Sequence, residues 1–216
     1  MMEERVQVST RQRLLREGLR LFAGRGFAGT TVGDIEAAAG LQPRRGALYR
    51  HFPSKEALLE AAVEEYNATA REAALQFTHA PADDPRTLAL TVGRWVLARL
   101  DDQRQISHIL EREGNRLPAL RDSYRAGTDA GFHAAAMVVR QWALEHHPDL
   151  DADAVGVILL GGLVNFRRSS WTLGAPPLDL DDQRFLDGLA TLFAALAGTG
   201  GPTAPQAPAP SSPRAS

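Results

Sequence analysis

Apolar residues recur at helical spacing along most of the chain. From Leu14 onward they return every three or four positions, and no stretch shows the sustained alternation of apolar and polar residues that marks a β-strand. No internal repeat is visible, which argues against a helical solenoid. The pattern therefore predicts an all-α protein.

Two helices are predicted near the N-terminus. Ser9 and Gln12 form a capping-box pattern ahead of the first helix, which the glycines of the AGRG segment end. A second, short helix begins at Thr30 or Thr31 and ends at Gly40. A tight, glycine-containing turn between two short helices is the outline of a helix-turn-helix, although many helical hairpins share this outline.

A third helix is predicted at about residues 43–52. Pro43 suits the first helical position because its missing N–H costs nothing there, and Gln42 would then be the N-cap. Pro53 and Ser54 are expected to stop this helix and to cap the next one, in which apolar residues continue at helical spacing.

Five helical segments are predicted beyond residue 80. They begin at Asp84–Pro85, at about 102, at Leu117–Pro118, at Asp151 or Asp153, and at about 181. The fourth of these contains AVGVILLGGLVNF, which is apolar on nearly every side and is therefore expected to be buried all round. The closing segment 198–216 has few large apolar residues and is predicted to be a disordered tail.

Composition excludes several kinds of site and location. The chain has no cysteine, which rules out disulfides, thiolate metal ligands and cysteine nucleophiles. No apolar run reaches the roughly 18 residues that a membrane span needs, and the first residues lack an apolar signal region. We expect a soluble, cytoplasmic protein with no membrane partner.

Charge is divided unevenly along the chain. Residues 10–55 carry nine basic and three acidic residues, whereas residues 67–216 carry 14 basic and 17 acidic ones. A basic head, residues 10–55, on a mildly acidic body, residues 67–216, suggests a polyanion partner for the head alone. A solvated charged face is the alternative.

At this point the residues resemble a known family. The run RLFAGRGFAGTTVGDIEAAAG, followed by GALYRHFPSKEALLEAAVEE, is similar to the DNA-binding segment of the tetracycline-repressor (TetR) family over about residues 10–60. The resemblance implies an all-α homodimer with an N-terminal three-helix helix-turn-helix domain and a helical ligand-binding and dimerisation domain. It implies a repressor that a ligand releases from a palindromic operator in double-stranded DNA.

The resemblance also indicates which head residues meet DNA. Tyr49, His51 and Lys55 match positions that contact phosphates in the family, and Thr31 is a similar candidate. The helix that follows Ser54 adds a favourable dipole for a phosphate near Lys55. Surface decoration with no such contact is the alternative for all four.

The segment ahead of Tyr49 departs from the family pattern. Family members usually place seven residue steps between the turn glycine and the tyrosine, whereas Gly40 to Tyr49 is nine steps here. We interpret this as a two-residue insertion that lengthens the recognition helix at its front. Candidate groove contacts in its first turn are Arg44, Arg45, Gly46 and Ala47, with arginine able to bond bidentately to guanine.

The C-terminal part offers candidates for a ligand pocket. Trp95, Tyr124, Phe132 and Phe166 are the predicted pocket walls for a small, largely apolar effector, and ordinary core packing is the alternative. Scattered histidines are expected to supply orienting hydrogen bonds. No metal-ligand spacing or catalytic constellation stands out, so neither a metal, a cofactor nor an enzyme is predicted.

These observations give one hypothesis with two rivals. Residues 1–55 form the DNA-binding domain and 56–197 the regulatory domain, and helices at about 153–171 and 181–197 build the homodimer. The first rival is a ligand-independent DNA-binding regulator, which would lack a cavity of roughly 300 Å³ or more. The second is a helical enzyme, which would gather titratable side chains in that cavity.

Overall fold

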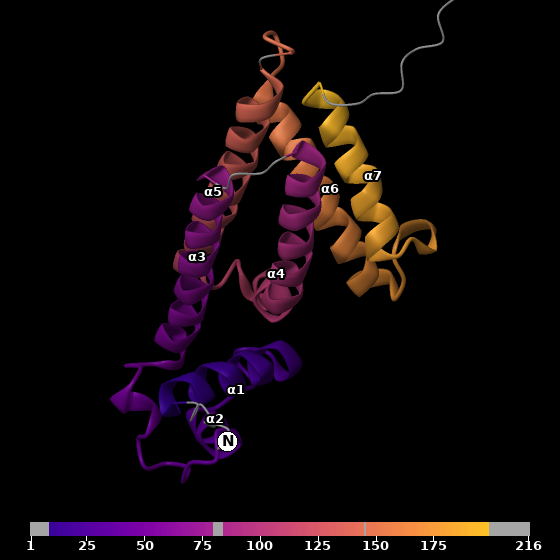
Figure 1. Ribbon diagram of the computed structural model, residues 1–216. Coiled ribbons are helices and arrows are strands. Elements are labelled where there is room, and N and C mark those ends of the chain that lie inside the picture. Colours follow the sequence, from indigo (N-terminus) through magenta and orange to yellow (C-terminus); the bar gives the residue numbers. More distant parts are fainter. Residues whose placement is uncertain (1–8, 80–83, 145, 199–216) are drawn as a thin grey trace, which may run out of the picture.

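Every regular element in the described part of the chain is a helix (Figure 1). The computed structural model describes residues 9–79, 84–144 and 146–198. The helices are α1 Thr10–Arg25, α2 Val32–Ala38, α3 Lys55–His79, α4 Pro85–Glu113, α5 Pro118–Ala143, α6 Ala152–Leu173 and α7 Asp182–Leu196. Within these ranges the predicted all-α class is confirmed.

The predicted helix starts are largely confirmed by their caps. Ser9 and Gln12 form the expected capping box at α1, and Thr31 caps α2 through the backbone N–H of Asp34. Ser54 accepts a hydrogen bond from the backbone of the first turn of α3. Asp84 and Asp151 do the same for α4 and α6.

Helix α4 is longer than predicted. The sequence suggested a new helix at about 102, but α4 runs unbroken from Pro85 to Glu113. Asp101 and Asp102 are exposed, while Leu97 and Gln103 on either side continue the buried face. The helical spacing of buried residues is the same before and after the two aspartates. They therefore lie on the exposed face of the helix and do not interrupt it.

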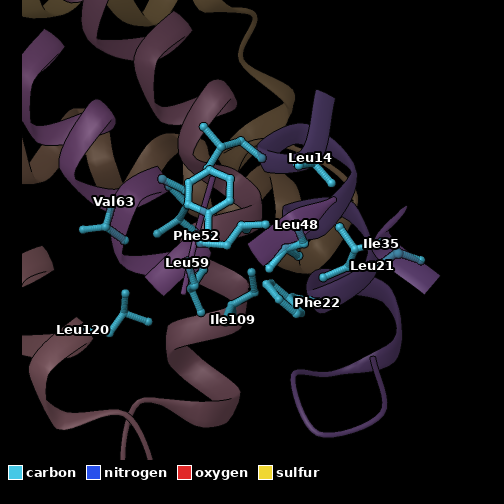
Figure 2. Packing of buried hydrophobic residues seen from close by; sticks show 14 of the residues in the cluster. Leu14, Leu21, Phe22, Ile35, Leu48, Phe52, Leu59, Val63, Ile109 and Leu120 are labelled. Carbon is cyan, nitrogen blue, oxygen red and sulfur yellow. The ribbon is translucent and has the colours of Figure 1, made fainter. Parts of the chain in front are cut away.

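The head and the body share one hydrophobic core. Phe22, Ile35, Leu48 and Phe52 from the head meet Leu59 of α3 in a single buried cluster (Figure 2). The same cluster takes in residues from α4 and α5, among them Ile106, Ile109 and Leu120. The proposed boundary at 55/56 therefore lies within continuous packing, at the first residue of α3.

Two further clusters lie in the body, among α4, α5, α6 and α7. Helix α6 is not buried all round in the single chain, contrary to the prediction. Gly156 sits directly against the backbone of Ala136 on α5, whereas the side chains of Val157 and Ile158 are 50% and 69% exposed. The helix is apolar on both faces, but one chain covers only one of them. The predicted tail lies outside the described residues, apart from Gly198.

Candidate nucleic-acid interface and ligand cavity

The loop between α1 and α2 is fastened by the first residue of α3. The amino group of Lys55 donates to the carbonyl oxygens of Phe27 at 2.7 Å and Thr30 at 3.0 Å. It also lies 4.3 Å from the centroid of the Phe27 ring. The Thr30 hydroxyl donates to the Gly26 carbonyl at 2.9 Å. Lys55 thus joins the start of α3 to the turn before α2, which uses much of its donor capacity within the protein.

Thr31 is likewise engaged by its own helix. Its hydroxyl accepts from the backbone N–H of Asp34 and donates to the Asp34 carboxylate at 2.6 Å. The hydrogen bond from the Thr31 hydroxyl and a second one from the Thr31 backbone N–H lower the pKa of the Asp34 carboxyl. The side chain stays exposed at the N-terminus of α2, so its predicted phosphate contact stays a prediction.

The predicted recognition helix at 43–52 is wrong. Residues 43–45 form a turn, and the only helix in this segment is a single 3-10 turn, Leu48–Arg50. Arg44 and Gly46 have positive φ values of 64° and 68°, a conformation that no α-helix contains. Gln42 therefore caps no helix, and the insertion enlarges a turn.

A buried carboxylate explains why this segment turns. Glu36 on α2 is fully buried, and its two oxygens accept from the backbone N–H groups of Arg44 at 2.8 Å and Leu48 at 3.0 Å. In a helix starting at Pro43, the N–H of Leu48 would bond to the carbonyl of Arg44 four residues earlier. The carboxylate takes that N–H instead. Glu36 was missed by the sequence analysis, although its place directly after the core residue Ile35 was the available signal.

The turn and the 3-10 helix present a basic face. Arg44, Arg45, Arg50 and His51 are exposed, and Tyr49 is 58% exposed. Among the described residues, no ion pair engages these arginine side chains. This face offers three uncompensated cations and a phenol, a combination suited to phosphates and base edges.

Two other predicted contacts are less open to a partner. Ala47 is buried, with 6% of its surface exposed, and Gly46 is half-buried. Both therefore support the turn from within. Arg50 was not among the predicted contacts, although its place beside Tyr49 in the motif pointed to it.

A cavity of about 320 Å³ opens among the helices of the body. It is lined by α4, α5, α6 and α7, with Tyr66 of α3 at one side. Trp95, Tyr124 and Phe132 all line it, as predicted. The volume falls within the range of small-molecule sites.

Phe166, the fourth predicted wall, does not line the cavity. Its ring stacks on that of Phe185, with the centroids 4.1 Å apart and the planes 8° from parallel. It is 2% exposed and belongs to the core cluster between α4, α6 and α7. The prediction was wrong because aromatic character alone does not reveal which face of a helix a residue occupies.

The polar groups of the cavity are gathered toward the head. Gln103 of α4 donates to the Tyr124 hydroxyl on α5, which lies 3.0 Å from the hydroxyl of Ser107. The Arg99 guanidinium lies 4.7 Å from the centroid of the Tyr66 ring. Burial raises the pKa of Tyr66 to about 12 and raises that of Tyr124 as well, so both phenols are neutral at pH 7.

Histidines and carboxylates do not take part in this cavity. His108 and His133 are exposed, and no histidine, aspartate or glutamate of the described part of the chain lines the cavity, which corrects the expectation of orienting histidines. Within the described ranges, no three such side chains gather where they could hold a metal ion. No helix in those ranges is long and apolar enough to cross a membrane.

Comparison with known proteins places the head. Residues 14–62 match the family described as "Bacterial regulatory proteins, tetR family". The chain is 46% identical over 56 residues to the HTH-type transcriptional regulator YerO of Bacillus subtilis, covering 26% of this chain and 19% of the relative. It is 41% identical over 56 residues to the HTH-type transcriptional repressor DhaR of a Mycobacterium species, covering 26% and 27%. The chain thus matches only a fifth to about a quarter of the length of these relatives.

A solved structure extends the likeness to the whole fold. The reduced form of Escherichia coli NemR superposes with a TM-score of 0.66 at 17% identity, over 89% of this chain and 100% of that one. At this identity the likeness concerns the fold alone. It covers the body as well as the head.

Proposed function

We propose that this chain is a homodimeric transcriptional repressor of the tetR family of bacterial regulatory proteins and that it binds an inverted-repeat operator, because residues 14–62 match that family. The observation that carries the proposal is the exposed basic face at the end of the head. Arg44, Arg45 and Arg50 stand there beside Tyr49, and no acid in residues 9–79, 84–144 or 146–198 forms an ion pair with them. Two such faces in a two-fold dimer would meet equivalent half-sites.

A small-molecule effector is the second part of the proposal. The cavity of about 320 Å³ favours a ligand-responsive regulator over a ligand-independent one. Helix α4 lines this cavity and then packs Ile106 and Ile109 into the core that holds α1. A ligand that prefers another position of α4 would shift the head and lower operator affinity.

The dimer is proposed to form through α6 and α7. Val157 and Ile158 on α6 and Leu192 on α7 are large apolar side chains that are at least half exposed in the single chain. Such residues on neighbouring helices are typical of a surface that a second copy covers.

An enzymatic role is not part of the proposal. The cavity holds two tyrosines with raised pKa values and two arginines, but no carboxylate or histidine that would serve as a general base. A regulator that reads the bacterial chromosome works in the cytoplasm, and the proposal requires no cofactor.

Selection of bound DNA from a random pool tests the DNA-binding part. We expect an inverted repeat whose affinity falls steeply with salt, because each neutralised phosphate releases counterions. The Arg44→Ala/Arg45→Ala variant should relax the preference at one or two positions in each half-site. Recovery of no motif, or an unchanged motif with the double variant, would contradict the assignment.

A further inference from the structure

The two ends of the cavity differ in chemistry. Helices α4 and α5 run antiparallel along it, since Leu88 packs with Val139 in one cluster while Gln103 bonds to Tyr124 at the other end. Fifteen residues separate the two positions on each helix, which corresponds to about 22 Å. The end at Leu88 is wholly apolar, and the polar lining residues lie toward the end at Gln103.

The charged groups that line the cavity are all cationic. Among the residues that the structure describes, Arg99 and Arg168 are the only charged ones in the lining, and their acidic partners, Asp102 and Glu111, are exposed and outside it. Exposed pairs of this kind contribute little and leave the guanidinium groups available to a ligand. The side chain of Arg99 is the more enclosed of the two, with 18% of it exposed.

Hydrogen-bond donors accompany the Arg99 charge. The Gln103 amide is buried, and the neutral Tyr124 phenol is held between Gln103 and Ser107. A guanidinium, an amide and a phenol together match an oxygen anion, and a carboxylate accepts such charge-assisted hydrogen bonds best. An amine would meet only like charge there.

From this arrangement we propose that the effector is an amphipathic monocarboxylate. Its anion would lie at Arg99, Gln103 and Tyr124, and its unbranched or weakly branched apolar body would run toward Leu88. The cavity of about 320 Å³ is large enough for an acid of this kind, since small-molecule sites begin at about 300 Å³. The inference rests on the proposed ligand-responsive function.

Calorimetry on the full chain with three probes of equal chain length tests this proposal. Decanoate should bind at least roughly tenfold more tightly than 1-decanol, and decylamine more weakly than either, because only the acid gains charge-assisted bonds. In Arg99→Met, which keeps the apolar stem, the ratio of acid to alcohol affinity should fall toward one. Arg94→Met is the matched control, since Arg94 is exposed on the same helix and does not line the cavity.

Three results would overturn the assignment of the head group. These are equal binding of the three probes by the unmodified protein, tighter binding of decylamine, and an unchanged ratio in Arg99→Met. If Arg99→Met fails to fold, Tyr124→Phe removes one donor and should lower the ratio several-fold. Release of the operator by the alcohol but not by the acid would contradict this inference and leave the proposed function intact. If none of the probes binds, the result would count against both.

A separate observation concerns the DNA-reading turn. Glu36 is fully buried and holds the N–H groups of Arg44 and Leu48, one with each carboxylate oxygen. Between these two anchor points lie Arg45, Gly46 and Ala47, so the carboxylate fixes both ends of the enlarged turn. A buried carboxylate that loses a partner is costly, which makes this conformation strongly preferred over a helix.

We infer that Glu36 is a positioning residue for sequence recognition, acting through Arg44 and Arg45. In Glu36→Gln only one oxygen remains to accept, and the new NH₂ group faces the second N–H. The selected operator motif should lose its preference at the positions read by the turn. Affinity for random DNA should change less than twofold, because Tyr49 and Arg50 lie outside the clamp.

The test compares motif selection and the ratio of operator to random-DNA affinity. Glu60→Gln on the exposed side of α3 is the control for the change in charge. A loss of operator and random-DNA affinity in equal proportion would reveal a merely structural role, and an unchanged motif would also overturn the inference. If Glu36→Gln does not fold, Glu36→Asp keeps the charge but is too short to reach both N–H groups, and the same loss of preference is expected.

Discussion

Single residues in the head divide between holding the fold and facing outward. Lys55 and Glu36 are both charged, and both form hydrogen bonds with backbone groups of the protein itself. The side chains of Arg44, Arg45 and Arg50 are instead exposed to solvent. Charge alone is therefore not enough to predict a DNA contact, and the intramolecular partners of each side chain have to be considered as well.

Replacing Lys55 with methionine should destabilise the protein. The variant keeps the apolar stem and the helix propensity, but it leaves the carbonyls of Phe27 and Thr30 without their donor and loses the contact with the Phe27 ring. We expect a loss of about 1–2 kcal/mol in the free energy of unfolding, measured by urea denaturation. Arg50→Met is the contrasting variant. It should leave stability unchanged and reduce the salt dependence of DNA binding by about one counterion per half-site.

Local pairings could be predicted from the sequence, and distant ones could not. The capping box at Ser9 lies within four residues, so its pattern is visible in the sequence itself. The acceptors of Lys55 lie 25 and 28 residues away, and the donors to Glu36 lie 8 and 12 residues away. Such contacts exist only after α1, α2 and α3 have packed together. For this reason Lys55 was interpreted as a phosphate ligand, and Glu36 was not singled out.

At the scale of elements, the recognition segment shows where helix-start signals fail. Pro43 does suit a helix N-terminus, but a short helix has a costly nucleus and needs support from its surroundings. Here the buried Glu36 carboxylate binds the N–H of Leu48, which the helix would use, and also that of Arg44. The tertiary contact outweighs the local signal, and the two extra residues enlarge the turn.

The left-handed turn can be tested with two glycine substitutions. Gly46→Ala places a Cβ on a residue with a φ of 68° and should cost about 1 kcal/mol of stability, together with operator affinity. Gly24→Ala is the control, because that glycine is helical and its added Cβ would meet no atom within 4 Å. It should stabilise the protein by about 0.5–1 kcal/mol, as judged by thermal unfolding. Equal effects of the two changes would contradict the positive φ at Gly46.

For the whole molecule, the sequence predicted the helix content and the existence of a cavity better than its lining. The helical period and the capping residues are enough to predict the helix content, because they are properties of each segment. The cavity walls depend on helix rotation, which placed Trp95 and Phe132 at the cavity and turned Phe166 onto Phe185. The exposure of Ile158 has a similar origin, because an apolar helix in a bundle can be covered from one side by its own chain and from the other by a second copy.

A single charged substitution can test dimer formation without disturbing the fold of the single chain. Ile158 is 69% exposed in the single chain, so Ile158→Asp should leave the unfolding of a monomer nearly unchanged. In a dimer built on α6 and α7, the same carboxylate would lie in an apolar interface without a partner, at a cost of several kcal/mol for each copy. Sedimentation at micromolar concentration should therefore show a dimer for the unmodified protein and a monomer for Ile158→Asp.

Operator binding should report the same change. The monomeric variant should bind one half-site weakly and lose the steep preference for the inverted repeat, because the heads of two copies are no longer linked. Ala154→Asp provides the control, since this residue is exposed in the first turn of the same helix, where a negative charge is tolerated. A dimer that survives Ile158→Asp would place the interface elsewhere on the molecule.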